Sequence, residues 1–235
     1  MRPVLVFRFS PGDEPGRFAH WLDANDRPWK LVALHEGEAV PQDASNVAGI
    51  GMMGGPMSVN DDLPWVAPME ALLRDAVKRG VPVIGHCLGG QLLAKALGAS
   101  VGRAAQTEIG WIDVEVTQPS FAREWFGGRD RFACFEWHYE AFTLPPRAKR
   151  VLTNRYNENQ AYVVDGVHIG FQGHPEMTAE IARSWIALSG DELPQHPTES
   201  TQTAAQILDN LESRVAALNA VADAVYTRWS QNLRD

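Results

Sequence analysis

Short apolar runs alternate with stretches of helical periodicity over the first hundred residues. The runs predict buried strands at 3–9, 29–34, 47–55 and 81–85. Apolar residues at three- and four-residue intervals predict helices at 14–25, 65–79 and 88–98. Strands and helices in this order are typical of a parallel sheet whose two faces are both covered by helices. The chain is therefore expected to fold as an α/β protein.

The second half of the chain has a different pattern. Short strand-like pieces are expected at 111–117, 131–137, 150–154, 160–164 and 167–173, before a helix at 178–190. A polar linker follows at 190–200. Apolar residues from Ala204 to Trp229 then predict one long amphipathic helix without internal Gly or Pro. Its apolar stripe either packs on the rest of the chain or forms a dimer contact.

Composition narrows the classes of partner. The net charge of the 235 residues is -8 and no basic cluster interrupts it, so neither nucleic acid nor an anionic membrane is expected as the main partner. No apolar run approaches the roughly 20 residues that span a bilayer. Arg8 interrupts the first apolar run, which we interpret as a strand and not a signal peptide. A soluble, cytoplasmic protein is expected.

Only two cysteines occur, and in a cytosolic chain both are expected to be free thiols. Cys134 lies in an aromatic, strand-like run and is interpreted as a buried core residue. Cys87 lies where a predicted strand ends and a helix begins, with Gly85, Gly89 and Gly90 around it. A helix amino terminus favours the thiolate, which is the nucleophilic form. This stretch alone leaves open whether Cys87 is a nucleophile or a packed thiol.

A cysteine nucleophile needs a base, and the base needs a group that orients it. His174 follows a predicted strand, and Glu176 lies two residues beyond it, after a proline. The carboxylate would hold the imidazole in one tautomer and stabilise its protonated form. A second His-Pro pair at His196 has no strand before it and is expected at the surface.

A glycine-rich loop follows the strand predicted at 47–55. The sequence Gly54-Gly55-Pro56 allows backbone N–H groups to face outward, although a plain turn would have the same composition. The three loops that carry these candidate residues each follow a predicted strand. Sites in parallel sheets gather at the carboxyl ends of the strands, so the loops are expected to meet there.

Together these motifs resemble the class I, or triad-type, glutamine amidotransferases. The G-x-C-x-G elbow stands at 85–89 with Gln91 shortly after, the G-G-P loop at 54–56, and the H-P-E pair at 174–176. The segments 107–111 and 137–142 are similar to further landmarks of that family. The resemblance covers residues 1–190 in the correct order, and residues 191–235 match none of it. We therefore expect two parts, an amidotransferase domain at 1–190 and a linker with a C-terminal helix at 191–235.

The resemblance implies an open, mostly parallel mixed sheet of the flavodoxin-like kind, flanked by helices. It also implies roles for residues. Cys87 would attack the γ-carbonyl of glutamine, His174 would move the proton, and Glu176 would orient His174. The backbone N–H groups of Gly55 and Leu88 would form an oxyanion hole.

The resemblance implies that further residues lie near the substrate. At several positions this sequence also differs from the family pattern. Gln91 and the backbone near His138 are expected beside the substrate, and neither a metal nor a cofactor is implied. Several positions depart from the family pattern, namely His86 in the elbow, Tyr139 and Glu140 in the 137–142 segment, and Gly173 before the histidine. His86 is interpreted as a tolerated substitution or as a group that tunes the thiolate.

Three functions remain open at this stage. A glutaminase would release ammonia for use by a synthase. Because residues 191–235 are too few for a second catalytic domain, that synthase is expected to be a separate partner protein. A hydrolase of γ-glutamyl amides or peptides would use the same chemistry with another leaving amine. A degenerate, non-enzymatic binding module is the third, and the intact Cys87, His174 and Glu176 argue against it.

Overall fold

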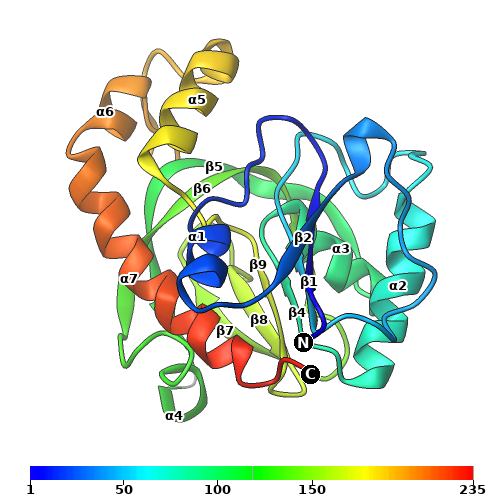
Figure 1. Ribbon diagram of the computed structural model, residues 1–235. Coiled ribbons are helices and arrows are strands. Elements are labelled where there is room, and N and C mark those ends of the chain that lie inside the picture. The colour runs from blue at the N-terminus through cyan, green and yellow to red at the C-terminus, as the bar shows by residue number, and fades with distance from the viewer. Residues whose placement is uncertain (118, 235) are drawn as a thin grey trace.

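A nine-stranded mixed sheet runs through the computed structural model, which describes residues 1–117 and 119–234 (Figure 1). The strands are β1 (Val4–Arg8), β2 (Trp29–Ala33), β3 (Gly49–Met52), β4 (Val83–Gly85), β5 (Val101–Val116), β6 (Arg131–Phe142), β7 (Ala148–Thr153), β8 (Ala161–Val164) and β9 (His168–Phe171). Their order across the sheet is β2-β1-β3-β4-β9-β8-β7-β5-β6. The predicted fold class, an α/β protein with a mixed sheet flanked by helices, is confirmed.

Parallel and antiparallel strands divide this sheet into two regions. The neighbours from β2 to β9 pair in parallel. Beyond β9 the pairs are antiparallel. In the parallel region the carboxyl ends of β1, β3, β4 and β9 lie at one edge of the sheet, where ligand sites of such folds occur.

Helices cover both faces of the sheet (Figure 1). They are α1 (Gly16–Ala24), α2 (Val66–Arg79), α3 (Leu88–Ala96), α4 (Pro119–Ala122), α5 (Ala179–Ser189), α6 (Ala204–Leu208) and α7 (Leu211–Ser230), with short 3-10 turns η1 (Leu34–Glu36) and η2 (Gly190–Glu192). One hydrophobic core joins α2 and α3 to the parallel strands. A second joins α1 and α7 to the other face. Local signals set the ends: α2 stops at Gly80 in the left-handed region, and the Thr178 side chain caps α5.

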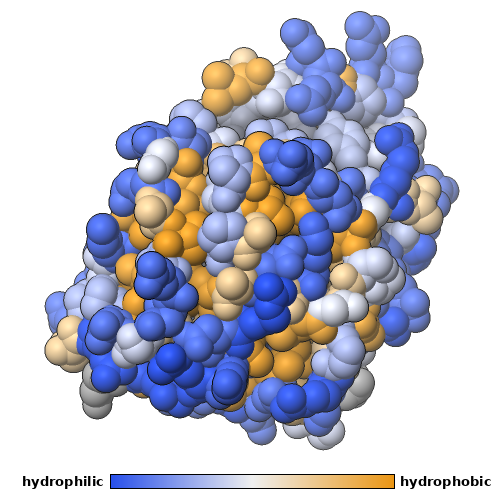
Figure 2. Space-filling view, turned by 90° about the vertical axis from the view of Figure 1, so that its right-hand side faces the viewer, coloured by the Kyte–Doolittle hydropathy of each residue, from blue (hydrophilic) through white to orange (hydrophobic). Residues whose placement is uncertain are grey.

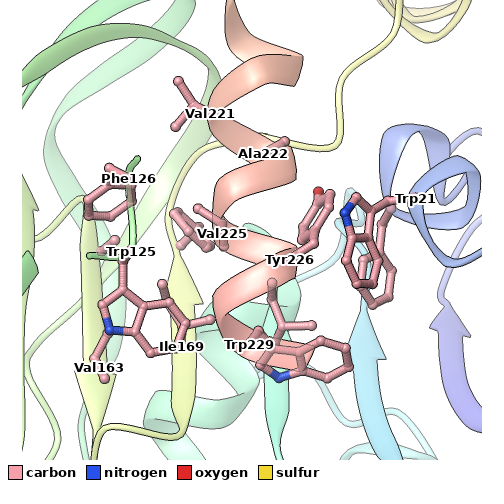
Figure 3. Packing of buried hydrophobic residues seen from close by; sticks show 14 of the residues in the cluster. Trp21, Trp125, Phe126, Val163, Ile169, Val221, Ala222, Val225, Tyr226 and Trp229 are labelled. Carbon is pink, nitrogen blue, oxygen red and sulfur yellow. The ribbon is translucent and has the colours of Figure 1, made fainter. Parts of the chain in front are cut away.

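The C-terminal helix α7 is an integral part of the second core. Figure 3 shows Val225, Tyr226 and Trp229 of α7 directed at the sheet and at Trp21 of α1. All three are fully buried. The apolar stripe of α7 therefore packs within its own chain, and the same residues do not form an exposed surface for a dimer.

The expected single helix from Ala204 to Trp229 is wrong, because two helices occupy this stretch. The chain leaves helical geometry at Asp209, and Asn210 adopts the left-handed region with φ 51°. Asp and Asn have low helix propensity, and Asn tolerates that region better than most residues. The apolar periodicity continues across the break, so the sequence pattern alone does not reveal it.

Two strands in the second half are longer than expected. β5 has 16 residues and β6 has 12, and they pair along most of their length. The first part of β5 is largely exposed and has no apolar alternation. Pattern reading therefore detects the buried part of this hairpin and misses the rest.

The segment expected to be a linker runs along β5. The N–H of Ile109 donates to Ser200 O at 3.0 Å, and the N–H of Gln202 donates to Ile109 O at 2.9 Å. The Gln202 side chain also bonds both backbone groups of Trp111. These bonds tie the segment to the sheet. The division of the chain into parts at 1–190 and 191–235 stays a prediction. Asp235, the last residue of the second part, lies outside the described residues.

The face that carries α2 has hydrophobic areas with hydrophilic residues between them (Figure 2). Along α2, Arg74 pairs with Glu70 and Arg79 pairs with Asp75. Within residues 1–117 and 119–234, no helix is both long and apolar enough for a membrane span.

Replacing the tryptophan at the end of α7 tests whether this helix belongs to the core. Trp229→Ala is expected to lower the free energy of unfolding by about 3–5 kcal/mol, because it leaves a large cavity. Leu208→Ala in α6 is the control, since Leu208 is 40% exposed, and it should change stability by less than about 1 kcal/mol. Urea unfolding measures both values. Equal, small losses would contradict the integral role of α7.

Candidate active site

The sharp turn between β4 and α3 places Cys87 at the carboxyl edge of the sheet. Cys87 has φ 47° and ψ -106°, which is a strained conformation for a residue with a side chain. Its side chain thereby leaves the direction of the strand and sits at the amino terminus of α3. The positive end of the dipole of this helix therefore lies beside the sulfur.

Glycines allow α3 to lie directly on the sheet. A Cβ atom at Gly89 would lie 2.5 Å from Met52 Cβ, and one at Gly90 would lie 2.2 Å from Phe171 O. A Cβ at Gly85 would meet the backbone of Gly89 at 2.4 Å. Any side chain at these positions would push α3 away from β3 and β9. The three glycines therefore set the height of Cys87 above the sheet.

His174 and Glu176 follow β9 as an ion pair buried beside this turn. His174 Nδ1 lies 2.8 Å from Glu176 Oε1, and each residue is 2% exposed. Because a carboxylate only accepts, the Nδ1 atom carries the proton, and Nε2 of the neutral ring has a free lone pair. Nε2 has no hydrogen-bond partner among the described residues.

His174 and Glu176 each stabilise the charged form of the other. Burial by itself lowers the pKa of His174, but Glu176 and the Cys87 sulfur outweigh it and hold that pKa well above its ordinary value. Burial by itself raises the pKa of Glu176, but His86 and His174 outweigh it and lower that pKa. The pair is thus suited to take up a proton on the imidazole while the carboxylate stays charged.

The glycine loop after β3 lies between the base and the elbow. A Cβ at Gly54 would lie 2.8 Å from His174 Cε1, and one at Gly55 would lie 2.7 Å from Leu88 Cδ2. The backbone N–H groups of Gly55 and Leu88 have no acceptor within residues 1–117 and 119–234. Two free donors next to a thiol are what an oxyanion would need.

The sequence predicts two substrate contacts, Gln91 and the backbone near His138. The structure places residues next to them in the chain beside Cys87. The Cys87 sulfur lies 4.0 Å from the carbonyl oxygen of Trp137. The His138 side chain points elsewhere, with Nε2 3.1 Å from Glu108. Gln91 donates to the carbonyl oxygen of Glu140 at 3.2 Å. The structure thus brings the 137–140 backbone to the site, while the His138 ring lies outside it.

Sequence reasoning missed several groups around the site. Gln172 Nε2 lies 3.8 Å from the Cys87 sulfur, although the sequence placed Gln172 only as the end of a strand. Trp185 of α5 packs edge-on against the His174 ring at 4.8 Å. Asp13, in the loop after β1, is buried, and burial raises its pKa. Only the strand order brings Asp13 and Trp185 here, so no local motif signals them.

The departures from the family pattern have structural counterparts. A Cβ at Gly173 would lie 2.3 Å from Glu136 Oε1, so this glycine makes room for a buried carboxyl group whose pKa burial raises well above its usual range. Tyr139 donates to Glu192 at 2.9 Å. Glu140 accepts from Ser58 at 2.8 Å. In the described part of the chain, no three His, Cys, Asp or Glu side chains are arranged to hold a metal ion.

The other expected positions are also placed by the structure. Both cysteines are free thiols, and Cys134 is buried in the core as predicted. The surface interpretation of His196 agrees with its exposure.

Filling the space above Gly85 tests whether the elbow depends on close packing. Gly85→Ala is expected to lower the free energy of unfolding by about 1–3 kcal/mol or more, because its methyl group overlaps the backbone of Gly89. Gly102→Ala is the control, since nothing lies within 4 Å of its added Cβ. Chemical denaturation measures both. A Gly85→Ala protein as stable as Gly102→Ala would contradict this packing.

Removing the charge of Glu176 tests the coupling within the pair. In Glu176→Gln the pKa of His174 is expected to fall, because burial still disfavours the imidazolium and its main compensating charge is gone. NMR titration of the imidazole measures this pKa. Glu180→Gln, at the exposed start of α5, should leave it unchanged. An unaltered pKa in Glu176→Gln would refute the coupling.

Known proteins are similar to this chain in sequence and in fold. The family model for glutamine amidotransferase class-I matches residues 21–187. A crystal structure of a glutamine amido transferase from Methylobacillus flagellatus is 43% identical and superposes with a TM-score of 0.97 over 100% of this chain and 96% of that one.

Two GMP synthase sequences are also similar to this chain. GMP synthase from Aeropyrum pernix is 31% identical over 91% of this chain, which spans only 42% of that protein. A protein from Pyrococcus abyssi, named as one of the subunits of GMP synthase, is 31% identical over 63% of this chain and 79% of its own length. The match of the family model over most of the sequence shows that this chain belongs to the class I glutamine amidotransferase family.

Proposed function

We propose that this protein hydrolyses the side-chain amide of glutamine with Cys87 as nucleophile. The observation that carries the proposal is the buried His174–Glu176 pair, with its raised imidazole pKa, beside a cysteine on a strained elbow. Membership of the family supports glutamine as the substrate. The assignment of each residue rests on the geometry and remains our proposal.

The reaction proceeds in two halves. His174 takes the Cys87 proton, and the thiolate attacks the γ-carbonyl carbon. The resulting oxyanion lies between the N–H groups of Gly55 and Leu88. When the C–N bond breaks, the proton on His174 passes to the leaving nitrogen, so ammonia departs and a glutamyl thioester stays on Cys87.

Water completes the second half. His174, again neutral, takes a proton from water as the hydroxide adds to the thioester carbonyl. The C–S bond then breaks, the proton on His174 returns to the Cys87 sulfur, and glutamate leaves. Glu176 keeps its charge throughout and stabilises the imidazolium in both halves. An oxyanion-hole donor of this kind contributes about 3–4 kcal/mol to such steps.

We propose that a separate synthase uses the ammonia. One similar protein is by name part of a GMP synthase with separate subunits, and another is a GMP synthase more than twice as long as the matched region. A γ-glutamyl amide or peptide would react through the same steps with another amine as leaving group. We keep this alternative as an outcome of the test.

A substrate comparison tests the proposal. Purified protein is incubated with glutamine or with γ-glutamyl dipeptides, and ammonia, free amine and glutamate are measured. We expect equal amounts of ammonia and glutamate from glutamine. Cys87→Ala should abolish turnover, with a loss of at least about 10³-fold. Cys134→Ala should retain turnover, because that thiol lies in the core.

Two results would contradict the proposal. Turnover of the dipeptides without turnover of glutamine would assign the alternative substrate class. Unchanged activity in Cys87→Ala would refute the nucleophile. Detection of a glutamyl adduct on Cys87 by mass spectrometry would support the thioester directly.

A further inference from the structure

The ladder between β5 and β6 is interrupted beside the site. Opposite Tyr139, the single residue of β6 at this point, β5 has the four residues 104–107. The register partners on either side are Arg103 with Glu140 and Glu108 with His138. An irregularity of this kind bends a strand and disrupts the ladder locally. Contacts other than the ladder therefore have to hold β6 in place at residues 137–140.

This part of β6 forms a wall of the site. Trp137 O lies 4.0 Å from Cys87 Sγ, so a substrate carbonyl group that reaches the sulfur has to fit beside the backbone of β6. The base is tied to the same strand at a separate point, because the N–H of His174 donates to Phe135 O at 2.8 Å. The position of residues 137–140 thus sets the width of the space at the sulfur independently of the base.

One carbonyl oxygen in this stretch receives two side-chain donors. Glu140 O lies 3.2 Å from Gln91 Nε2 and 3.1 Å from His138 Nδ1. A carbonyl oxygen only accepts, so His138 Nδ1 carries a proton and the Gln91 amide presents its nitrogen. Gln91 belongs to α3, the helix that begins directly after Cys87. The two hydrogen bonds therefore join the bent part of β6 to the helix that follows the thiol.

A buried carboxylate holds the His138 ring from its other side. His138 Nε2 lies 3.1 Å from Glu108 Oε2, and both residues are buried. Glu108 also accepts from Gln160 Nε2 at 2.8 Å and from Asn154 Nδ2 at 2.5 Å. Three donors compensate this buried charge and fix its direction. The ring that Glu108 binds is therefore kept in the orientation that directs Nδ1 at Glu140 O.

We propose that His138 is a positioning residue for substrate binding. Oriented by Glu108, it holds Glu140 O, and with it the backbone of β6, at the distance from Cys87 that a glutamine side chain needs. The inference rests on the proposed function and deepens it, because His138 acts through the β6 backbone on the space in which the substrate binds. The competing explanation is that His138 and Glu108 only satisfy each other inside the protein.

Three substitutions of His138 separate its two hydrogen bonds. Asn carries its amide nitrogen where the imidazole has Nδ1, so His138→Asn keeps a donor for Glu140 O. Gln carries its amide nitrogen where the imidazole has Nε2, so His138→Gln keeps the donor for Glu108 and loses the donor for Glu140 O. His138→Leu loses both donors.

Kinetics with glutamine give the first readout. In His138→Leu and His138→Gln, KM should rise about two- to tenfold, since the loss of one hydrogen bond changes an equilibrium by about this factor. The change in kcat should stay below about twofold, because Cys87, His174 and Glu176 are untouched. In His138→Asn, KM should stay closer to the wild-type value. A purely structural role of His138 predicts no such difference between the Asn and Gln variants.

Hydrogen exchange gives a second readout that needs no substrate. The backbone amides of residues 137–142 should exchange about two- to tenfold faster in His138→Leu and His138→Gln than in the wild-type protein. In His138→Asn they should exchange at close to the wild-type rate. Mass spectrometry of peptides measures these rates. The amides of β1, on the other side of the sheet, should keep their rates in all three variants.

His168→Leu is the matched control for the loss of a buried imidazole. His168 is buried at the start of β9, at the opposite end of that strand from His174. The control should keep the wild-type KM, kcat and exchange rates at 137–142. Circular dichroism checks that each variant is folded. The Asn and Gln variants both keep a polar side chain at position 138, so their comparison stands even where His138→Leu does not fold.

The outcomes decide between the two explanations. A higher KM and faster exchange in His138→Gln, with both closer to the wild-type values in His138→Asn, support the positioning role. Equal KM values and equal exchange rates in these two variants would overturn it. If the wild-type protein does not hydrolyse glutamine, the proposed function fails, whereas the exchange rates still decide whether His138 holds β6.

Discussion

A buried negative charge governs the arrangement of this molecule. Glu176 is almost completely removed from solvent, and such a carboxylate is tolerated only with close compensation. His174 supplies a hydrogen bond and a countercharge, and the start of α1 binds the backbone. The proposed chemistry depends on this arrangement, because a fixed charge behind the imidazole is what raises its basicity.

The close packing of α3 on the sheet is the second requirement. Strand order alone brings the ends of β3, β4 and β9 together, but it does not set the distance between a thiol and a base. The glycines beneath α3 set it, since each leaves less room than a methyl group needs. This geometry requires a strained backbone conformation at Cys87. Such a conformation persists only where the packing around it holds the residue in place.

The sequence was sufficient for the parts that local patterns encode. Buried parallel strands, the elbow at Cys87 and the pair at His174 all carry short-range signals, and their expected places agree with the sheet. The break at Asn210 could not be predicted, because the apolar repeat continues through it. Gln172 reaches the Cys87 sulfur only through tertiary packing, which periodicity does not describe.

The central claim is that Cys87, the Gly55–Leu88 donors and His174 converge on one reacting carbonyl group. The most direct measurement is a crystal structure after reaction with a diazoketone analogue of glutamine, which alkylates a nucleophilic cysteine and keeps a carbonyl beside the sulfur. The account predicts a bond to Cys87 with the carbonyl oxygen about 2.7–3.1 Å from the N–H groups of Gly55 and Leu88. A carbonyl oxygen directed away from both donors, or a bond to Cys134 instead, would contradict it.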